Sequence, residues 1–420
     1  MREPPPEIDY DSALGRHIVE LHIWAVRQGL LGADAAELFD GFCRRIIAAG
    51  VPLWRGYAAM ETLHPQWGGY GYTWRRDLNA IEPGHFERTT YRGPVWFDSP
   101  FAYLLNRRDD PLEETHPWRH LRRRLVGPEA QLDFPILKEF AAGGATDYFA
   151  EIVRFGEDGD PSWGTGIGYS FASDWPEGFR DDDLQLLKAV LPALSLTMMA
   201  HAGHTIASGL LAAYLGDDPG RRVHSGAIER GSVESLRAVL WYADIRGFTA
   251  LAETTAGDAV IELLNEVFEI LTASLRRRGG QVLKFMGDGM LAIFPLTDCG
   301  HRAICRDALD GAAEAMAALE RLDGSRRAAG KPWAEVDLAL HVGEVLYGNV
   351  GAVDRLDFTV IGPAVNEVAR IETLCEPLGC KVLVSAELAA AIGDDGGLVP
   401  LGRHPLRGVR EPVAVFALQL

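Results

Sequence analysis

Two stretches in the C-terminal half of the chain decide the fold and place one aspartate each: Trp241-Tyr-Ala-Asp-Ile-Arg-Gly-Phe-Thr249 and Val282-Leu-Lys-Phe-Met-Gly-Asp-Gly-Met290. In the first, an apolar run predicts a strand that delivers Asp244 to its end, just before a glycine turn. In the second, the flanking glycines permit a tight turn, which puts Asp288 at the tip of a hairpin. Carboxylates on neighbouring strand ends can bridge two magnesium ions about 3.5–4 Å apart, as phosphoryl or nucleotidyl transfer requires.

A third stretch supplies further polar groups: Phe358-Thr-Val-Ile-Gly-Pro-Ala-Val-Asn-Glu-Val-Ala-Arg370. It predicts a helix on which Asn366 and Arg370 lie one turn apart, on the same face. Taken with the two aspartates, this pattern favours an enzyme over a simple binding domain.

Composition limits the class of protein. At 420 residues the chain predicts two domains and a connector. A net charge of −18 argues against nucleic acid or an anionic membrane as the main partner. We read no segment as a membrane span and no signal peptide at the N-terminus. The cysteines at 43, 299, 305, 375 and 380 form no CxxC pair, which favours free thiols in a cytoplasmic protein.

The N-terminal half predicts a helical region over residues 10–50, then strands and loops over 51–175, then a helix from about 180 towards 214. The stretch 215–226 contains Gly and Pro, so we expect it to interrupt that helix and to mark the domain boundary. Beyond it, alternating strands and helices predict an α/β sandwich with helices packed on a sheet. The predicted elements there are strand 236–244, helix 258–278, hairpin 281–294, helix 300–322, strand 335–342, strand 355–361, helix 363–375 and strand 381–385.

From about residue 215 to 420 the sequence resembles the catalytic domain of class III adenylyl and guanylyl cyclases. Four motifs occur in the order of that family, and together they are very specific. They are Asp244–Thr249, Lys284–Gly289, His341–Gly351 and Thr359–Arg370. The resemblance implies a ferredoxin-like, palm-type α+β fold over 231–420 and the conversion of ATP to cyclic AMP and pyrophosphate.

The resemblance also implies a role for each site residue. Asp244, Asp288 and the Ile245 carbonyl would hold two Mg²⁺ or Mn²⁺ ions per active site, and Lys284 with Thr359 would read adenine. The amides of Gly247, Phe248 and Thr249 would bind the terminal phosphates. Asn366 would orient the ribose, and Arg370 would stabilise charge at the α-phosphate. Arg407 would lie near the phosphates.

Three readings of the catalytic half stay open. The preferred one is an adenylate cyclase. A guanylate cyclase is opposed by Lys284 and Thr359, where guanylyl cyclases typically carry Glu and Cys. A catalytically silent module that binds nucleotide is opposed by the complete residue set. Because this family shares each site between two protomers and this chain carries both halves, the resemblance implies a homodimer.

The N-terminal half is less specific. The pattern of 178–196 resembles the last helix of GAF sensor domains, and Gly164–Phe171 resembles a late strand of that fold. We therefore expect an N-terminal helical extension over 1–34, a GAF-like α+β sensor domain over 35–200 with an unidentified small-molecule ligand, and a helical connector over 180–230. The aromatic residues from Trp54 to Trp74 are candidates for lining its ligand pocket.

Overall fold

The computed structural model describes residues 8–89, 93–106, 118–155, 166–297, 300–393 and 397–420. These residues form two compact units, Met1–Leu210 and Leu211–Leu420. The long helix α6 (Asp181–Leu215) begins in the first unit and ends in the second. Cys299, the start of the predicted late strand at Gly164, and part of the N-terminal extension lie outside the described residues.

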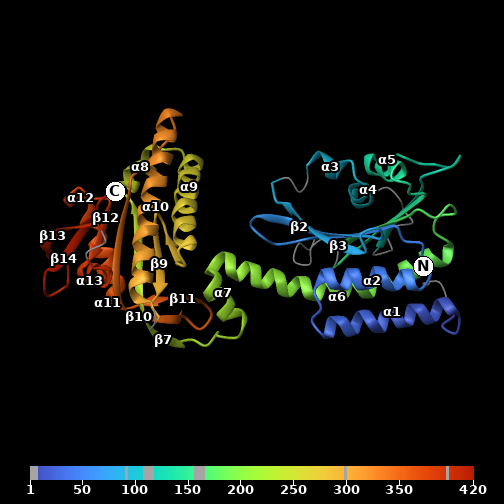
Figure 1. The fold of residues 1–420 in the computed structure, drawn as a ribbon, viewed down its shortest axis with the longest axis horizontal. Helices are drawn as coiled ribbons and strands as arrows, with labels where there is room; N and C mark the ends of the chain where they lie inside the picture. Colours follow the sequence, from blue (N-terminus) through green and yellow to red (C-terminus); the bar gives the residue numbers. More distant parts are fainter. Residues whose placement is uncertain (1–7, 90–92, 107–117, 156–165, 298–299, 394–396) are drawn as a thin grey trace. The chain divides into compact units, whose positions relative to one another are not determined.

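The first unit is built on a six-stranded antiparallel sheet with the order β3-β2-β1-β6-β5-β4. One face carries the N-terminal helices and α6, and the other carries short helices (Figure 1). Its strands are β1 (Arg55–Glu61), β2 (Trp67–Arg75), β3 (Ala80–Glu87), β4 (Trp118–Arg124), β5 (Asp147–Val153) and β6 (Ile167–Ser173). Its other helices are α1 (Ala13–Leu30), α2 (Ala35–Ala48), α3 (Pro94–Phe97), α4 (Pro100–Asn106) and α5 (Pro135–Ala142).

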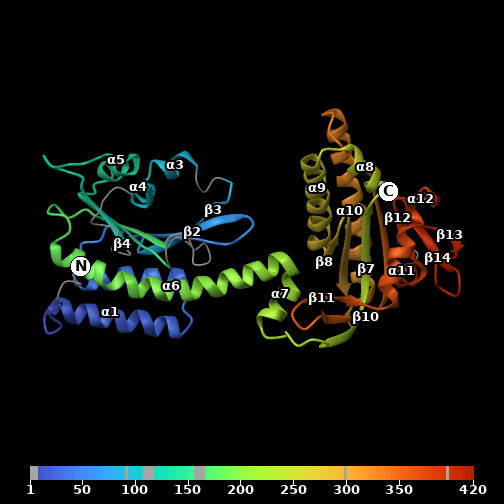
Figure 2. The same ribbon diagram turned by 180° about the vertical axis from the view of Figure 1, so that it is seen from behind.

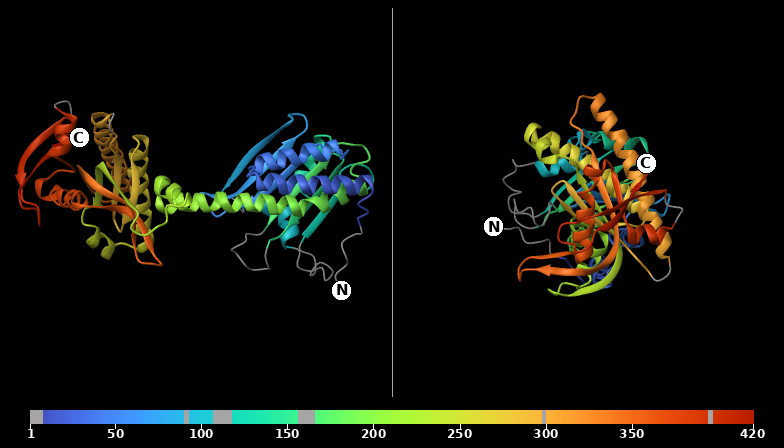
Figure 3. Two further views of the ribbon diagram at one scale, coloured as in Figure 1. Left: turned by 90° about the horizontal axis from the view of Figure 1, so that it is seen from below. Right: turned by 90° about the vertical axis from the view of Figure 1, so that its left-hand side faces the viewer.

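Helices α1 and α2 are separate because two caps start them. Ser12 accepts a hydrogen bond from the Gly15 amide, and Asp34 accepts one from the Glu37 amide. Both helices lie alongside α6 (Figure 3), where Thr197 donates to the Ala25 carbonyl over 3.3 Å. The single helical region expected over residues 10–50 is therefore a helix pair.

Helix α6 qualifies our expectation about membrane spans. Its segment Ala189–Leu215 contains no Asp, Glu, Lys or Arg, and by length and composition it is one helix that could cross a membrane. Of its most apolar 18-residue window, 44% is buried within the protein. The buried residues of its first half, among them Val190, Leu194 and Met198, pack into the core of the first unit. This packing is that of a core helix of a globular unit.

The second unit has a mixed sheet with the order β13-β14-β12-β10-β7-β9-β8, and β11 pairs with β10. In chain order, β7-α9-β8-β9-α10-β10 forms a βαββαβ unit whose strands lie in the order 4-1-3-2, the ferredoxin-like arrangement. The elements are β7 (Val233–Ile245), α9 (Gly257–Arg277), β8 (Gln281–Met286), β9 (Gly289–Pro295), α10 (His301–Ala328), β10 (Val336–Gly351), β11 (Leu356–Ile361) and β12 (Val382–Ser385). The predicted C-terminal fold is confirmed.

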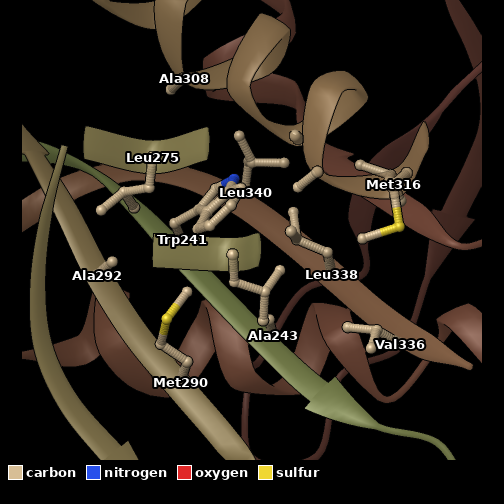
Figure 4. Packing of buried hydrophobic residues seen from close by; sticks show 14 of the residues in the cluster. Trp241, Ala243, Leu275, Met290, Ala292, Ala308, Met316, Val336, Leu338 and Leu340 are labelled. Atoms are coloured by element: carbon tan, nitrogen blue, oxygen red, sulfur yellow. The ribbon is translucent and has the colours of Figure 1, made fainter. Parts of the chain in front are cut away.

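Helices cover both faces of this sheet (Figure 2). On one face α9 and α10 enclose a core centred on Trp241, which is completely buried between Leu275, Met290 and Leu340 (Figure 4). The other face is covered by α11 (Pro363–Glu372) and α12 (Cys375–Leu378). The helix start expected at Gly247–Thr249 is that of α8 (Phe248–Thr254), whereas sequence patterns did not predict α13 (Ala386–Ile392), β13 (Leu398–His404) or β14 (Val413–Leu418).

The interruption expected over 215–226 is only partly right. Helix α6 does end at Leu215, because Gly216 adopts φ +94°. A second helix, α7 (Asp217–His224), follows at once and packs on the second unit. Tyr347 of β10 donates a 3.0 Å hydrogen bond to Asp218, and Arg222 forms an ion pair with Glu234 of β7. Two acidic residues in the first turn of α7 and three basic residues in its last turn favour this short helix, because their charges oppose the partial charges at the helix ends.

Candidate active site

Asp244 lies at the end of the central strand of the second unit. Strand β7 pairs with β10 on one side and β9 on the other, and its segment Ala238–Trp241 is buried just before the strand ends. Asp244 is half-buried there, and one of its carboxylate oxygens accepts a 3.0 Å hydrogen bond from the Ile245 amide.

The hairpin between β8 and β9 brings Asp288 beside Asp244. Met286 pairs with Gly289, so Gly287 and Asp288 form a two-residue turn in which Gly287 adopts φ +67°. The next residue, Met290, pairs with Ala243 of β7. A Cβ atom at Gly289 would lie only 3.5 Å from an Asp244 carboxylate oxygen. The β7–β9 register and the lack of a side chain at Gly289 therefore place the turn against the end of β7.

Asp288 changes the titration of its neighbour Asp244. Burial raises the pKa of Asp244 to about 6, and the charge and hydrogen bonding of Asp288 contribute to the rise. Proximity of like charges is costly unless a cation neutralises them. The donor set, two carboxylates and a main-chain carbonyl at Ile245, consists of the hard oxygen ligands that Mg²⁺ and Mn²⁺ prefer. The described residues contain no group of three or more His, Cys, Asp or Glu that could hold a metal.

A third acid beside this pair, Glu372, was missed by sequence reasoning. Burial raises its pKa to about 7, and the charges of Asp244, Asp337 and Asp288 add to the effect. Glu372 is the last residue of α11 and is only 9% exposed. The available signal was its spacing, because it extends the buried stripe of Ala364, Val368 and Ile371 at helical periodicity.

Arg246 stabilises the turn that follows Asp244 through ion pairs. Its guanidinium makes 2.9 and 2.5 Å contacts with both carboxylate oxygens of Asp337, which is 4% exposed and faces Asp244 in the β10–β7 register. It also binds Glu335 over 2.9 Å. Bidentate pairing of this kind fixes geometry as well as charge. The arginine of the first motif is therefore a structural clamp behind the candidate site.

The backbone at 247–249 begins α8. Gly247 adopts φ +68°, and the first helical hydrogen bond runs from the Leu251 amide to the Gly247 carbonyl. The Phe248 and Thr249 amides precede that bond, as expected at a helix start.

The candidate base-reading residues come from two strands. Lys284 lies on β8, and its ammonium group forms an ion pair with Asp357 of β11. Thr359 lies on β11, opposite Gly348 of β10. Asp357 was not predicted as a site residue.

Asn366 and Arg370 lie on α11, four residues apart. Asn366 is exposed and Arg370 is half-buried. The Arg370 guanidinium lies beside Gly408, where an added Cβ would be 3.5 Å from it. Arg407, the neighbour of that glycine, is exposed. Glu372, two residues beyond Arg370, is the residue of this helix whose pKa is raised by the charges of Asp244 and Asp288, after the larger effect of burial. Since successive helical residues are about 100° apart, Arg370 points about 200° away from Glu372. Arg370 and Glu372 therefore lie on nearly opposite faces of α11.

A family model described as the adenylate and guanylate cyclase catalytic domain matches residues 234–419. Residues 234–419 are a class III cyclase catalytic domain. The family description includes both adenylate and guanylate cyclases.

Curated relatives agree with this family. The cyclase half is similar to the adenylate cyclase of Anabaena cylindrica, with 32% identity over 164 residues, which are 38% of this chain and 31% of that protein. It is also similar to adenylate cyclase 1 of Rhizobium meliloti strain 1021, with 31% identity over 170 residues, 40% of this chain and 25% of that protein. The chain thus spans less than a third of the length of these relatives.

Among solved structures, the adenylyl cyclase CyaB from P. aeruginosa matches with 26% identity and a TM-score of 0.41. That match covers 45% of this chain and 96% of the other. We base the family assignment on the sequence matches alone. The GAF-like reading of the N-terminal unit stays a prediction.

Proposed function

We propose that this protein is an adenylate cyclase that converts ATP to 3′,5′-cyclic AMP and pyrophosphate. The observation that carries the proposal is the pair Asp244 and Asp288, brought together at a strand end and a hairpin turn of a cyclase domain.

Two Mg²⁺ or Mn²⁺ ions per site would be held by Asp244, Asp288 and the Ile245 carbonyl. When bound, they would lower the pKa of the ribose 3′-hydroxyl and neutralise charge around the α-phosphate. Arg246 keeps the metal-binding turn in place through Asp337. The amides of Gly247, Phe248 and Thr249 would donate to the terminal phosphates.

Adenine selectivity would rest on Lys284 and Thr359. The ammonium donates to N1 of adenine, and the threonine hydroxyl accepts from the exocyclic amine. Guanine presents a donor at N1 and an acceptor at C6, so it would leave groups unpaired. Asn366 would orient the ribose, Arg370 would stabilise negative charge on the α-phosphate, and Arg407 would lie near the phosphates.

We further propose that the enzyme is a homodimer. Arg370 lies on the opposite face of α11 from Glu372, the residue of that helix whose pKa the charges of Asp244 and Asp288 raise, so a second chain that presents its aspartates to Arg370 and Asn366 would complete the site. Two chains related by twofold symmetry would complete two equivalent sites.

The N-terminal unit would act as a cytoplasmic sensor that regulates catalysis. Within it lies a cavity of about 350 Å³ lined by residues from the β1–β2 turn and α6. The lining includes Thr62, His64, Tyr70, Thr205 and Ser208. Of the aromatic residues suggested for a ligand pocket, Tyr70 lines this cavity; the tryptophans do not, and Trp74 is buried in the core. A small polar molecule in this cavity would contact α6, the helix that continues into the cyclase unit.

Turnover of ATP and GTP by the full chain, with Mn²⁺ or Mg²⁺, tests the activity. We expect cyclic AMP as the main product and a clear preference for ATP. Replacing Lys284 by Glu together with Thr359 by Cys should depress ATP use. A preference for GTP would make the protein a guanylate cyclase, and no turnover on either nucleotide would favour a silent nucleotide-binding module.

Complementation tests the shared site. Asp244→Ala and Arg370→Ala chains should each be inactive, and a mixture should regain up to about half of the activity per heterodimer, since one of its two sites is intact. No recovery, with subunit exchange shown by differently tagged chains, would contradict the shared site.

A further inference from the structure

The cavity of the N-terminal unit is lined by the turn that joins β1 to β2 and by the part of α6 that belongs to this unit. Its volume of about 350 Å³ suits a small molecule. Leu63 and Ile206 supply apolar surface. The polar lining consists of hydroxyl groups and imidazoles, which belong to Thr62, Tyr70, Thr205, Ser208, His64 and His204. Every polar side chain of this lining is of a type that can donate a hydrogen bond.

His64 is a hydrogen-bond donor with a fixed direction. Its Nδ1 atom accepts a 3.1 Å hydrogen bond from the Gln66 amide, so the neutral ring carries its proton on Nε2. The Cδ2 atom, which is bonded to Nε2, lies 3.5 Å from the position that a Cβ atom on Gly209 would take. The Nε2–H edge of the ring therefore faces α6, which forms the other wall of the cavity.

Arg88 holds the turn that carries His64. Its guanidinium donates to the carbonyls of His64, Thr62 and Trp67 over 2.8, 2.9 and 3.1 Å. Carbonyl groups satisfy the hydrogen bonds of a guanidinium without cancelling its charge, so a positive charge stays next to the turn. In the described part of the chain, no Asp or Glu lines the cavity. An anion would therefore meet donors and a nearby cation, with no lining carboxylate to repel it.

Gly209 leaves room for an occupant. It lies inside α6, where a glycine costs about 1 kcal/mol of helix stability relative to alanine. A Cβ atom at this position would make only an ordinary van der Waals contact with His64, so packing does not require glycine here. The missing side chain instead keeps the cavity open on the α6 side.

We propose that this cavity binds a small monocarboxylate with a short apolar body, whose carboxylate accepts hydrogen bonds from the His64 Nε2–H and from the hydroxyls of α6. Leu63 and Ile206 would contact the apolar body. A metal ion fits the cavity less well, because no carboxylate or thiolate of the described residues joins the two imidazoles. The bound anion would link the β1–β2 turn to α6. Its effect on catalysis rests on the proposed sensor function, whereas binding itself does not depend on cyclase activity.

Calorimetric titration of the full chain with butyrate tests the proposal, and butyramide is the uncharged control of the same shape. We expect butyramide to bind at least about tenfold more weakly, because hydrogen bonds to a charged acceptor are the stronger ones. His64→Phe should weaken butyrate binding by about tenfold or more, because it removes the donor and keeps a ring of similar size. His17→Gln, a change on α1 away from the cavity lining, should leave binding unchanged. Gly209→Leu should abolish binding by filling the cavity without lowering the melting temperature, since leucine is a better helix former than glycine.

The absence of butyrate binding at millimolar concentrations, equal binding of butyrate and butyramide, or undiminished binding by Gly209→Leu overturns the proposal. The Gly209→Leu variant decides the question if His64→Phe does not fold. Failure of the proposed function looks different. A chain that binds butyrate through His64 but forms cyclic AMP at the same rate with and without butyrate supports the binding site and rejects its regulatory role. A chain that binds butyrate but forms no cyclic nucleotide rejects the cyclase activity and supports the binding site.

Discussion

Glu151 is a buried acid whose replacement by glutamine should stabilise the N-terminal unit at alkaline pH. It lies on β5, is 1% exposed, and neither carboxylate oxygen has a hydrogen-bond partner among the described residues. It points to the same side as Phe149 and Val153, towards the helices. Three groups face it: Tyr169 on β6, His120 on β4 and Lys188 on α6. Of these, Lys188 carries the charge that attracts the ionised carboxylate.

Burial raises the pKa of Glu151 from 4.5 to about 8, and the charge of Lys188 offsets only part of the rise. The folded state therefore holds the proton more tightly than the unfolded state does. The contribution of Glu151 to the free energy of unfolding is fully present below about pH 4.5 and is lost as the pH rises through about 8. At about 1.4 kcal/mol per pKa unit, the loss of unfolding free energy is on the order of 5 kcal/mol. Relaxation of the protein around the charged carboxylate and entry of water reduce this loss to about 2–3 kcal/mol.

Urea unfolding of the full chain at pH 5.5 and 8.5 measures this effect. Eight of the ten tryptophans precede residue 200, so intrinsic fluorescence reports mainly on the N-terminal unit. Wild type should lose stability between the two pH values relative to Glu151→Gln, and the two proteins should nearly agree at pH 5.5. Glu20→Gln, the same change at an exposed site on α1, should behave as wild type. Equal pH dependence in wild type and Glu151→Gln would refute the reasoning.

Other predictions concern the cyclase unit. Asp244→Asn and Asp288→Asn should each reduce turnover by at least about a hundredfold without loss of helical circular dichroism, since each removes a metal ligand; near-normal rates with Mg²⁺ would exclude the two-metal site. Direct titration should show Mn²⁺ affinity falling as pH drops below about 6, where Asp244 gains its proton. Arg246→Ala should cost about 3 kcal/mol of unfolding free energy by leaving buried Asp337 unpaired, whereas exposed Arg230→Ala should cost almost nothing; equal losses would argue against the clamp.

Local sequence patterns were sufficient for much of the cyclase unit. The apolar run before Asp244 predicted β7, and the glycines around Asp288 predicted the hairpin, because turns and strands depend on neighbouring residues. Glu372 and Asp357 were missed because their partners are distant in sequence. Only the β7–β10 register puts Asp337 opposite Asp244, and only tertiary packing brings β11 to Lys284. Helix α7 was missed because Pro219 and Gly220 were read as breakers, although Pro is tolerated in the first turn of a helix.

The opposite orientation of Arg370 and Glu372 on α11 has a kinetic consequence. An enzyme whose single chain lacks a complete site gains activity with the square of chain concentration as long as dimers are scarce. Well above the dissociation constant the dependence becomes linear. In the proposed homodimer, expression level would therefore affect specific activity in addition to any control by the N-terminal unit, and a twofold change in protein in a cell at low abundance would produce about a fourfold change in the rate of product formation.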